Sequence, residues 1–104
     1  MRANRSGPAT PQDRYLIVSG DDFGLSSQVN KGVLQAHKNG ILTNTSLMVT
    51  GGAWREAVEI AKSLPTLAIG LHLTLVQGRA ALSPSQIPKI TDGQGNFSNN
   101  AMYS

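Results

Sequence analysis

Two adjacent carboxylates and one histidine are the residues of this chain best suited to chemistry. Asp21 and Asp22 stand side by side in the stretch SGDDFG, directly after an apolar run, and His72 follows much later in LAIGLHLTL. Neighbouring carboxylates repel each other, and a nearby cation would offset that repulsion. An imidazole together with carboxylates suits Zn²⁺, Mn²⁺ or Fe²⁺, and also Mg²⁺ where waters complete the coordination shell. These residue types therefore indicate a divalent-metal site.

The pair of acids suggests a division of labour. Side chains of neighbouring residues diverge, so one aspartate could hold a metal while the other takes a proton from water. The alternative is structural, because an Asp-Asp pair after a strand is also a common turn. Likewise, His72 could be a buried, hydrogen-bonded histidine, and His37, near the end of a predicted helix, is best explained by a contact with the helix dipole. The pattern alone weighs the catalytic and the turn interpretations equally.

The elements that must position these residues alternate between strands and helices. Continuous apolar runs predict strands that are covered on both faces. Serines before a helical repeat, an Asn-Gly pair after it and a later proline predict where the helices begin and end. In chain order, we expect a strand over Tyr15–Gly20, a helix over Ser27–Asn39, a strand over Thr45–Thr50, a helix from Ala53 to Leu64, and a strand over Leu67–Leu75.

This alternation predicts an α/β fold with parallel strands joined by right-handed crossovers. The carboxyl ends of parallel strands share one edge, so we expect both acids, just past the first strand, to lie near His72. His72 has small neighbours on its own face of the third strand, which leaves room for a ligand. The opposite face is expected to bury against helices, and its residues are Ile69, Leu71, Leu73 and Leu75. Three strands are too few to close a (β/α) barrel of ~250 residues, so we expect the start of a larger architecture.

Composition excludes several other classes of protein. The chain of 104 residues has no cysteine, so disulfides and thiolate metal sites are excluded. A net charge of +3 and 5% aromatic residues give little support for a nucleic-acid partner. No apolar run approaches the ~20 residues of a membrane span, and no signal peptide is apparent, so we expect a cytoplasmic protein. Residues 1–14 are expected to form a disordered leader, and the open sheet edges predict oligomerisation or low stability.

The motifs and their order resemble one family closely. The segment YLIVSGDDFGLSSQVNKGVLQAHKNGILTNTSLMVTG is similar to the opening of the YdjC-like carbohydrate deacetylases, also called the ChbG family, with their ADDFG(L/M)S and GI(L/V)TSTSLM motifs. IGLHLTLVQGR resembles their (V/I)GLHL(T/N)LTEG block, with Gln77 in place of the usual glutamate. The resemblance covers residues 15–97, and a hopanoid-biosynthesis-associated branch is a candidate for the closer relative.

The resemblance implies a deformed (β/α) barrel that removes acetyl groups from N-acetylated sugars such as chito-oligosaccharides. It aligns Asp21 with the general base, and Asp22 and His72 with ligands of a divalent metal ion, Mg²⁺ or Zn²⁺. Residues 15–104 would then be the N-terminal part of the deacetylase domain, without the third metal ligand, a later histidine. A second hypothesis is therefore a non-catalytic fragment that binds a sugar or a partner. A phosphoesterase is a weaker alternative, because only Lys31 and Lys38 are basic between residues 19 and 50.

Overall fold

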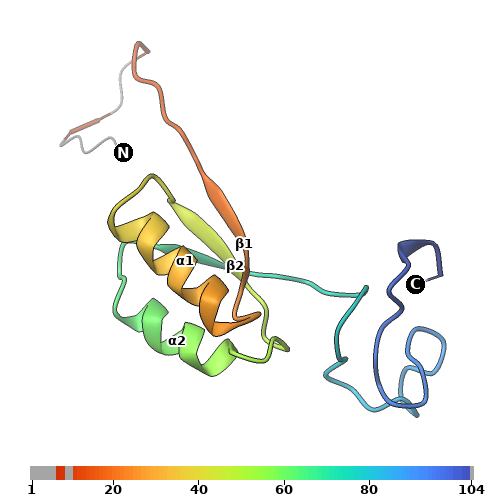
Figure 1. The fold of residues 1–104 in the computed structure, drawn as a ribbon. Helices are drawn as coiled ribbons and strands as arrows, with labels where there is room; N and C mark the ends of the chain where they lie inside the picture. The colour runs from red at the N-terminus through yellow and green to blue at the C-terminus, as the bar shows by residue number, and fades with distance from the viewer. Residues whose placement is uncertain (1–6, 9–10, 104) are drawn as a thin grey trace.

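A computed structural model describes residues 7–8 and 11–103, which form a parallel α/β unit and an irregular C-terminal segment (Figure 1). The sheet has the order β1-β2-β3, and both neighbouring pairs are parallel. The predicted β-α-β-α-β alternation is therefore confirmed, whereas closure into a barrel remains a prediction. The elements are β1 (Ser19–Phe23), α1 (Ser27–Lys38), β2 (Asn44–Leu47), α2 (Trp54–Lys62), β3 (Ala68–Leu71) and a short 3₁₀ helix, η1 (Ala101–Tyr103).

Helix α1 begins where the sequence predicts, because the Ser26 side chain accepts a hydrogen bond from the Val29 N–H at 3.2 Å. Its buried residues, Asn30, Val33 and His37, are spaced i, i+3 and i+7 and therefore line one face. Both helices lie on the same side of the sheet (Figure 1). The buried apolar core consists of Phe23, Val33, Leu42, Ala57, Leu64 and Leu67.

Strand β1 begins later than the sequence predicts. Tyr15, Leu16 and Ile17 are 64%, 71% and 75% exposed, and the strand starts only at Ser19. The reason is the position of β2: its first residue, Asn44, pairs with Ser19, and the Thr43 backbone reaches back only to Val18. The acids consequently lie inside β1 rather than just past it.

The third strand is shorter than predicted. β3 ends at Leu71, so His72 directly follows the strand instead of lying inside it. The aliphatic face that the sequence expects to be buried is open within the described residues, with Leu71 60%, Leu73 80% and Leu75 63% exposed. Leu71 pairs with Leu47, which packs against the core, so this face points to the side of the sheet that carries the helices, but neither helix covers it at the edge strand β3.

The C-terminal segment is held together by short-range contacts. Two antiparallel bridges pair Arg79 with Asn96 and Thr91 with Phe97. Between them, the Asp92 carboxylate accepts hydrogen bonds from the backbone N–H groups of Gln94 and Asn96, each at 2.9 Å. The hydrogen bond from the Asn96 backbone is the main cause that lowers the pKa of Asp92.

The structure tests the predictions about the N-terminus and about membrane spans only in part. Most of the expected leader, residues 1–6 and 9–10, lies outside the described residues, and residues 11–14 of it contain no helix or strand. Among the helices that the structure describes, none combines the length and the apolar character needed to cross a membrane.

Candidate active site

The two acids occupy a β-bulge in β1. Gly20 pairs with Thr45 and Phe23 pairs with Leu47, so Asp21 and Asp22 together stand opposite the single residue Ser46. A bulge of this kind adds one residue to one strand, bends it locally and can re-aim a side chain. Both predicted interpretations of the acid pair placed it just past the strand, and the structural one placed it in a turn. The bulge instead brings both acids to one position of the ladder.

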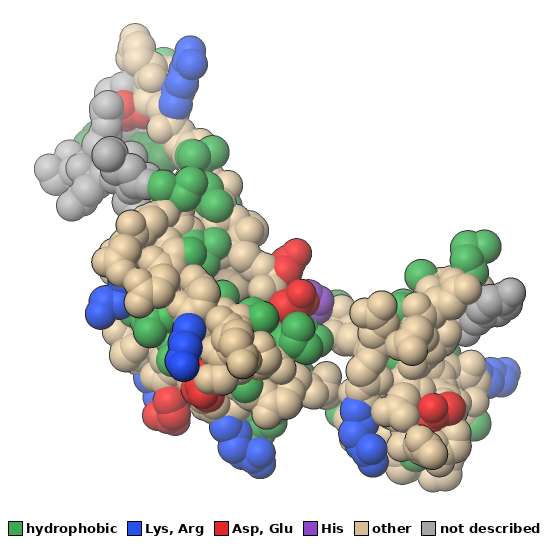
Figure 2. All heavy atoms as spheres, in the orientation of Figure 1, with side chains coloured by type: hydrophobic (Ala, Val, Ile, Leu, Met, Phe, Trp, Pro, Cys, Tyr) green, Lys and Arg blue, Asp and Glu red, His purple; other side chains and the backbone are tan. Residues whose placement is uncertain are grey.

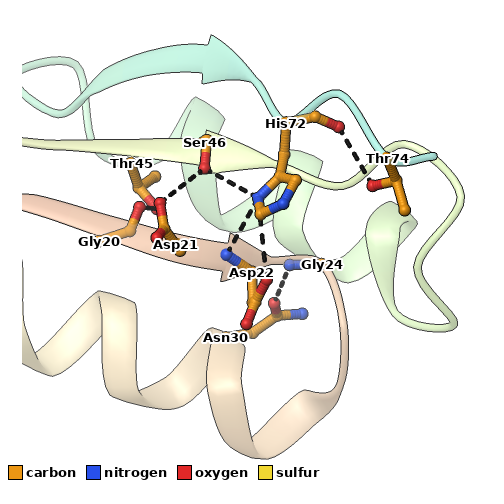
Figure 3. Close-up of polar contacts among 9 residues, drawn as sticks. All are labelled: Gly20, Asp21, Asp22, Gly24, Asn30, Thr45, Ser46, His72 and Thr74. Atoms are coloured by element: carbon orange, nitrogen blue, oxygen red, sulfur yellow. Dashed lines mark hydrogen bonds and ion pairs between the residues drawn. The ribbon is translucent and has the colours of Figure 1, made fainter. Parts of the chain in front are cut away.

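Ser46 joins the predicted base to the histidine (Figure 3). Its hydroxyl donates to Asp21 Oδ1 at 3.3 Å and lies 3.0 Å from His72 Nδ1. His72 itself is held by its backbone N–H, which donates to the Leu47 carbonyl at 2.9 Å. One serine on the central strand therefore orients groups from both outer strands.

Asp22 and His72 form the closest carboxylate–imidazole pair of the site. Asp22 Oδ1 lies 3.7 Å from His72 Nδ1, and the two side chains are 49% and 25% exposed. The Asp22 backbone N–H also points at the same nitrogen, at 3.4 Å. The predicted proximity of Asp22 and His72 is confirmed.

The hydrogen bonds around His72 admit two proton arrangements. With Nδ1 unprotonated, the ring accepts from the Ser46 hydroxyl and from the Asp22 N–H. With Nδ1 protonated, the ring donates to Ser46, whose own proton then goes to Asp21. The serine hydroxyl has one proton, so it donates either to Asp21 or to His72, and it can accept from His72 while it donates to Asp21.

The backbone after the bulge is unusual. Asp22 has a φ of 63° and Gly24 a φ of 99°, both in the left-handed region. Gly24 is also closely packed, because a Cβ at this position would lie 3.0 Å from the Met48 carbonyl oxygen. The turn between β1 and α1 thus requires glycine at residue 24. The bulge before it holds Asp22 in a backbone conformation that few residues other than glycine adopt.

The donor set at this edge fits part of a metal site. A carboxylate oxygen and an imidazole nitrogen are ligands that Zn²⁺ and Mg²⁺ accept, and 3.7 Å is close to the separation of two ligands that each lie ~2.1 Å from one ion. Zinc sites in proteins usually have three or more protein ligands. Within the described part of the chain, no group of three or more His, Asp or Glu side chains is arranged to hold an ion. Asp22 and His72 are therefore two potential ligands, which is fewer than a usual zinc site has.

A cavity opens beside His72. Its volume is about 350 Å³, and it lies between the C-terminal segment and the stretch that continues from β3. The acidic and histidine side chains gather near the waist between these two parts of the molecule (Figure 2). The lining residues are mainly apolar, with polar contributions from Thr50, His72 and Thr74.

Sequence reasoning missed two residues at this edge, Ser46 and Asn30. Asn30 is fully buried in α1 and hydrogen-bonds the Gly24 N–H at 2.7 Å. A signal for it was available: Asn30 lies three residues before Val33 and seven before His37, on the face that faces the core. Ser46 gave no comparable signal, because a serine in a short strand is unremarkable until its bulged partner is known.

Comparison with known proteins now gives the family. The family model for YdjC-like proteins matches residues 15–104. The chain belongs to the YdjC-like family. The predicted resemblance is confirmed over the whole segment that carries the motifs.

Individual relatives agree with this assignment. A carbohydrate deacetylase of Thermoanaerobacter pseudethanolicus is 43% identical over 84 residues, which are 81% of this chain and 34% of the relative. A chitooligosaccharide deacetylase of Salmonella paratyphi B is 39% identical over 79 residues, which are 76% of this chain and 30% of the relative. The chain thus spans about a third of the length of the curated relatives that it matches.

A solved structure supports the fold. The crystal structure of an Enterococcus faecalis protein proposed to cleave cellobiose phosphate matches with a TM-score of 0.77 and 38% sequence identity. The match covers 84% of this chain and 34% of the other. The β-α-β-α-β arrangement is therefore shared with this protein of known structure.

Proposed function

We propose that the protein is a carbohydrate deacetylase that removes acetyl groups from N-acetylated sugars such as chito-oligosaccharides. In this proposal Asp21 is the general base, and Asp22 and His72 hold a divalent ion, Mg²⁺ or Zn²⁺. The observation that carries it is the 3.7 Å approach of Asp22 to His72 beside Asp21, in a chain similar to carbohydrate and chitooligosaccharide deacetylases. The β-α-β-α-β unit would form the opening of a (β/α) barrel.

The reaction is the hydrolysis of an amide. The oxygen of a water molecule bonds to the acetyl carbon, the bond from that carbon to the sugar nitrogen breaks, and a general acid gives the leaving amine a proton. Asp21 is exposed at the strand edge, where it would take a proton from the attacking water. The Ser46 hydroxyl holds one oxygen of Asp21, which leaves the other free for that proton. A divalent ion held by Asp22 and His72 would supply Lewis-acid polarisation of the acetyl carbonyl.

The cavity beside His72 is the candidate substrate site. Its volume of about 350 Å³ falls in the range of small-molecule sites. His72 is part of its wall, so a sugar bound there would bring its acetyl group near the acid pair. The apolar lining suits the apolar faces of sugar rings, while Thr50 and Thr74 offer hydroxyl groups.

Substitution of Asp21 tests the proposal. With the protein at its full natural length, acetate release from N-acetylated chito-oligosaccharides should fall on the order of 10²- to 10⁴-fold in Asp21→Asn, because the amide has no basic oxygen. Metal content, measured by elemental analysis, should stay at the wild-type level. Asp92→Asn is the matched control, because it removes a carboxylate from an exposed loop of the C-terminal segment.

Two results would contradict the proposal. Deacetylation that survives in Asp21→Asn would remove Asp21 from the role of base. A wild-type protein that releases no acetate and binds no stoichiometric metal would instead favour the second hypothesis, a sugar-binding or partner-binding module.

A further inference from the structure

We infer that Asn30 is a positioning residue for Asp22. Its carboxamide fixes the turn that keeps Asp22 in the left-handed conformation in which its carboxylate faces His72. The inference rests on the proposed function, since it concerns how one of the proposed metal ligands is held. We call the contacts of Asn30 with Gly24, Ala53 and Glu56 the Asn30 clamp.

The Asn30 side chain has one possible orientation. It is 0% exposed, and its Oδ1 accepts from the Gly24 N–H at 2.7 Å. Its Nδ2 donates to the Ala53 carbonyl at 3.0 Å and to Glu56 Oε1 at 3.1 Å. Gly24 N–H can only donate, while the carbonyl and the carboxylate can only accept, so a flipped amide would lose all three bonds.

The clamp is anchored on the second helix. Ser27 Oγ lies 3.1 and 3.0 Å from the two oxygens of Glu56, so the carboxylate is held by two residues of α1. Glu56 is in the first turn of α2, where a negative charge is stabilised by the helix dipole. A single carboxamide thereby ties the turn after β1 to both helices.

Both backbone polar groups of Gly24 are hydrogen-bonded, one of them by the Asn30 clamp. Its N–H is bound by Asn30, and its carbonyl accepts from the Ala53 N–H at 2.9 Å. Gly51 packs so closely that a Cβ there would lie 2.2 Å from the Gly24 oxygen. Gly24 therefore has little freedom to shift.

This rigidity reaches Asp22 through a short path. The Asp22 carbonyl accepts from the Leu25 N–H at 2.9 Å, and the Phe23 side chain between them is fully buried. An aspartate stays in the left-handed region only where its surroundings fix it. Without Asn30, the buried Gly24 N–H would have no partner, and the turn would relax toward ordinary dihedral angles. Asp22 would then move away from His72.

The test uses the protein at its full natural length and an exchanged pair. Asn30→Asp keeps an acceptor for Gly24 but loses both donors and places a second carboxylate beside Glu56. Asn30→Asp combined with Glu56→Gln exchanges the carboxylate and the carboxamide and restores one hydrogen bond between them. Val33→Ala is the matched control, because it removes buried atoms one turn along α1 without touching the turn.

We expect kcat to fall about 10- to 100-fold in Asn30→Asp, as for other residues that orient metal ligands, with KM changed less than about 3-fold. The double variant should recover kcat at least ~10-fold relative to Asn30→Asp. By NMR hydrogen exchange, the Gly24 amide should lose protection in Asn30→Asp relative to the amides of β2, and regain it in the double variant. Val33→Ala should lower overall stability while leaving kcat of the folded protein unchanged.

The inference is overturned if a folded Asn30→Asp variant keeps wild-type kcat and wild-type Gly24 exchange, or if Val33→Ala lowers kcat equally. The exchange measurement needs no catalysis. A protein without deacetylase activity would therefore refute the proposed function, while Gly24 exchange would still decide whether the clamp exists.

Discussion

The two histidines of this chain lie at opposite edges of one sheet and have opposite surroundings. His37, at the end of α1, is buried; its Nδ1 lies 2.7 Å from the Leu42 carbonyl, and its Nε2 lies 2.9 Å from Thr66 Oγ1. His72, at the carboxyl edge, remains partly exposed and faces Asp22 and Ser46. One histidine has both ring nitrogens bound by neutral groups, and the other lies among carboxylates.

The difference shows how the sheet separates stability from chemistry. At the edge with His37, the hydrogen bonds link the end of α1 to the loops that enter β2 and β3. At the edge with His72, the polar groups share partners, and a strained bulge presents them to solvent. In parallel α/β folds, the amino ends of strands commonly serve stability, and the carboxyl ends serve function.

The largest expected effect comes from removing the histidine of the exposed edge. His72→Ala should weaken binding of Zn²⁺ by at least ~100-fold, because the proposed site loses its imidazole ligand. The free energy of unfolding should change by less than about 1 kcal/mol, since the side chain is partly exposed. Isothermal titration and urea denaturation measure the two quantities. Wild-type affinity for Zn²⁺ in the folded variant would show that His72 is no ligand.

Removing the other histidine should have the reverse effect. His37→Ala leaves a cavity and removes the hydrogen bond to the Leu42 carbonyl in the core, so the free energy of unfolding should fall by about 2–4 kcal/mol. Affinity for Zn²⁺ per folded molecule should be unchanged. Urea denaturation tests this, with Lys38→Ala as the control at the exposed neighbouring position. Equal losses of Zn²⁺ affinity in His37→Ala and His72→Ala would show that the two edges of the sheet do not differ in metal binding.

The smallest effect concerns the conformation of Asp22. Asparagine tolerates the left-handed region well, whereas alanine there is unfavourable by about 1 kcal/mol. Asp22→Asn and Asp22→Ala lose the same charge, so the difference between their free energies of unfolding reports the backbone alone. We expect Asp22→Ala to be less stable than Asp22→Asn by about 1 kcal/mol in urea denaturation. Equal stabilities would mean that the bulge relaxes and is not held at its φ of 63°.

Sequence periodicity predicted the order of elements and the meeting of Asp22 with His72. It placed the first strand too early, because the apolar run at Tyr15–Val18 reads as a strand whether or not a neighbour is present to pair with it. Here β2 supplies no partner before Ser19. The row of leucines after Ile69 similarly indicated burial, yet β3 is an edge strand, and the described residues leave these side chains largely exposed.

The residue types predicted the chemistry of the site, but the hydrogen bonds that connect its residues were not predicted. Carboxylates and imidazole have chemistry that a sequence reveals directly. The roles of Ser46 and Asn30 arise from hydrogen bonds to residues 26 positions away, at His72 and Glu56, which no local pattern encodes. No sequence pattern indicates the bulge either, because one additional residue in a short strand leaves the apolar alternation almost unchanged.

That additional residue has a consequence for comparing related sequences. Regular pairing between Gly20 and Phe23 would leave one position opposite Ser46, and this chain fits two residues there. A relative that is one residue shorter in this interval would still align well and could retain an aspartate. It would nevertheless lack the place for a second acid. The number of residues between Gly20 and Phe23 therefore distinguishes a site with two acids from a site with one, before any side chain is compared.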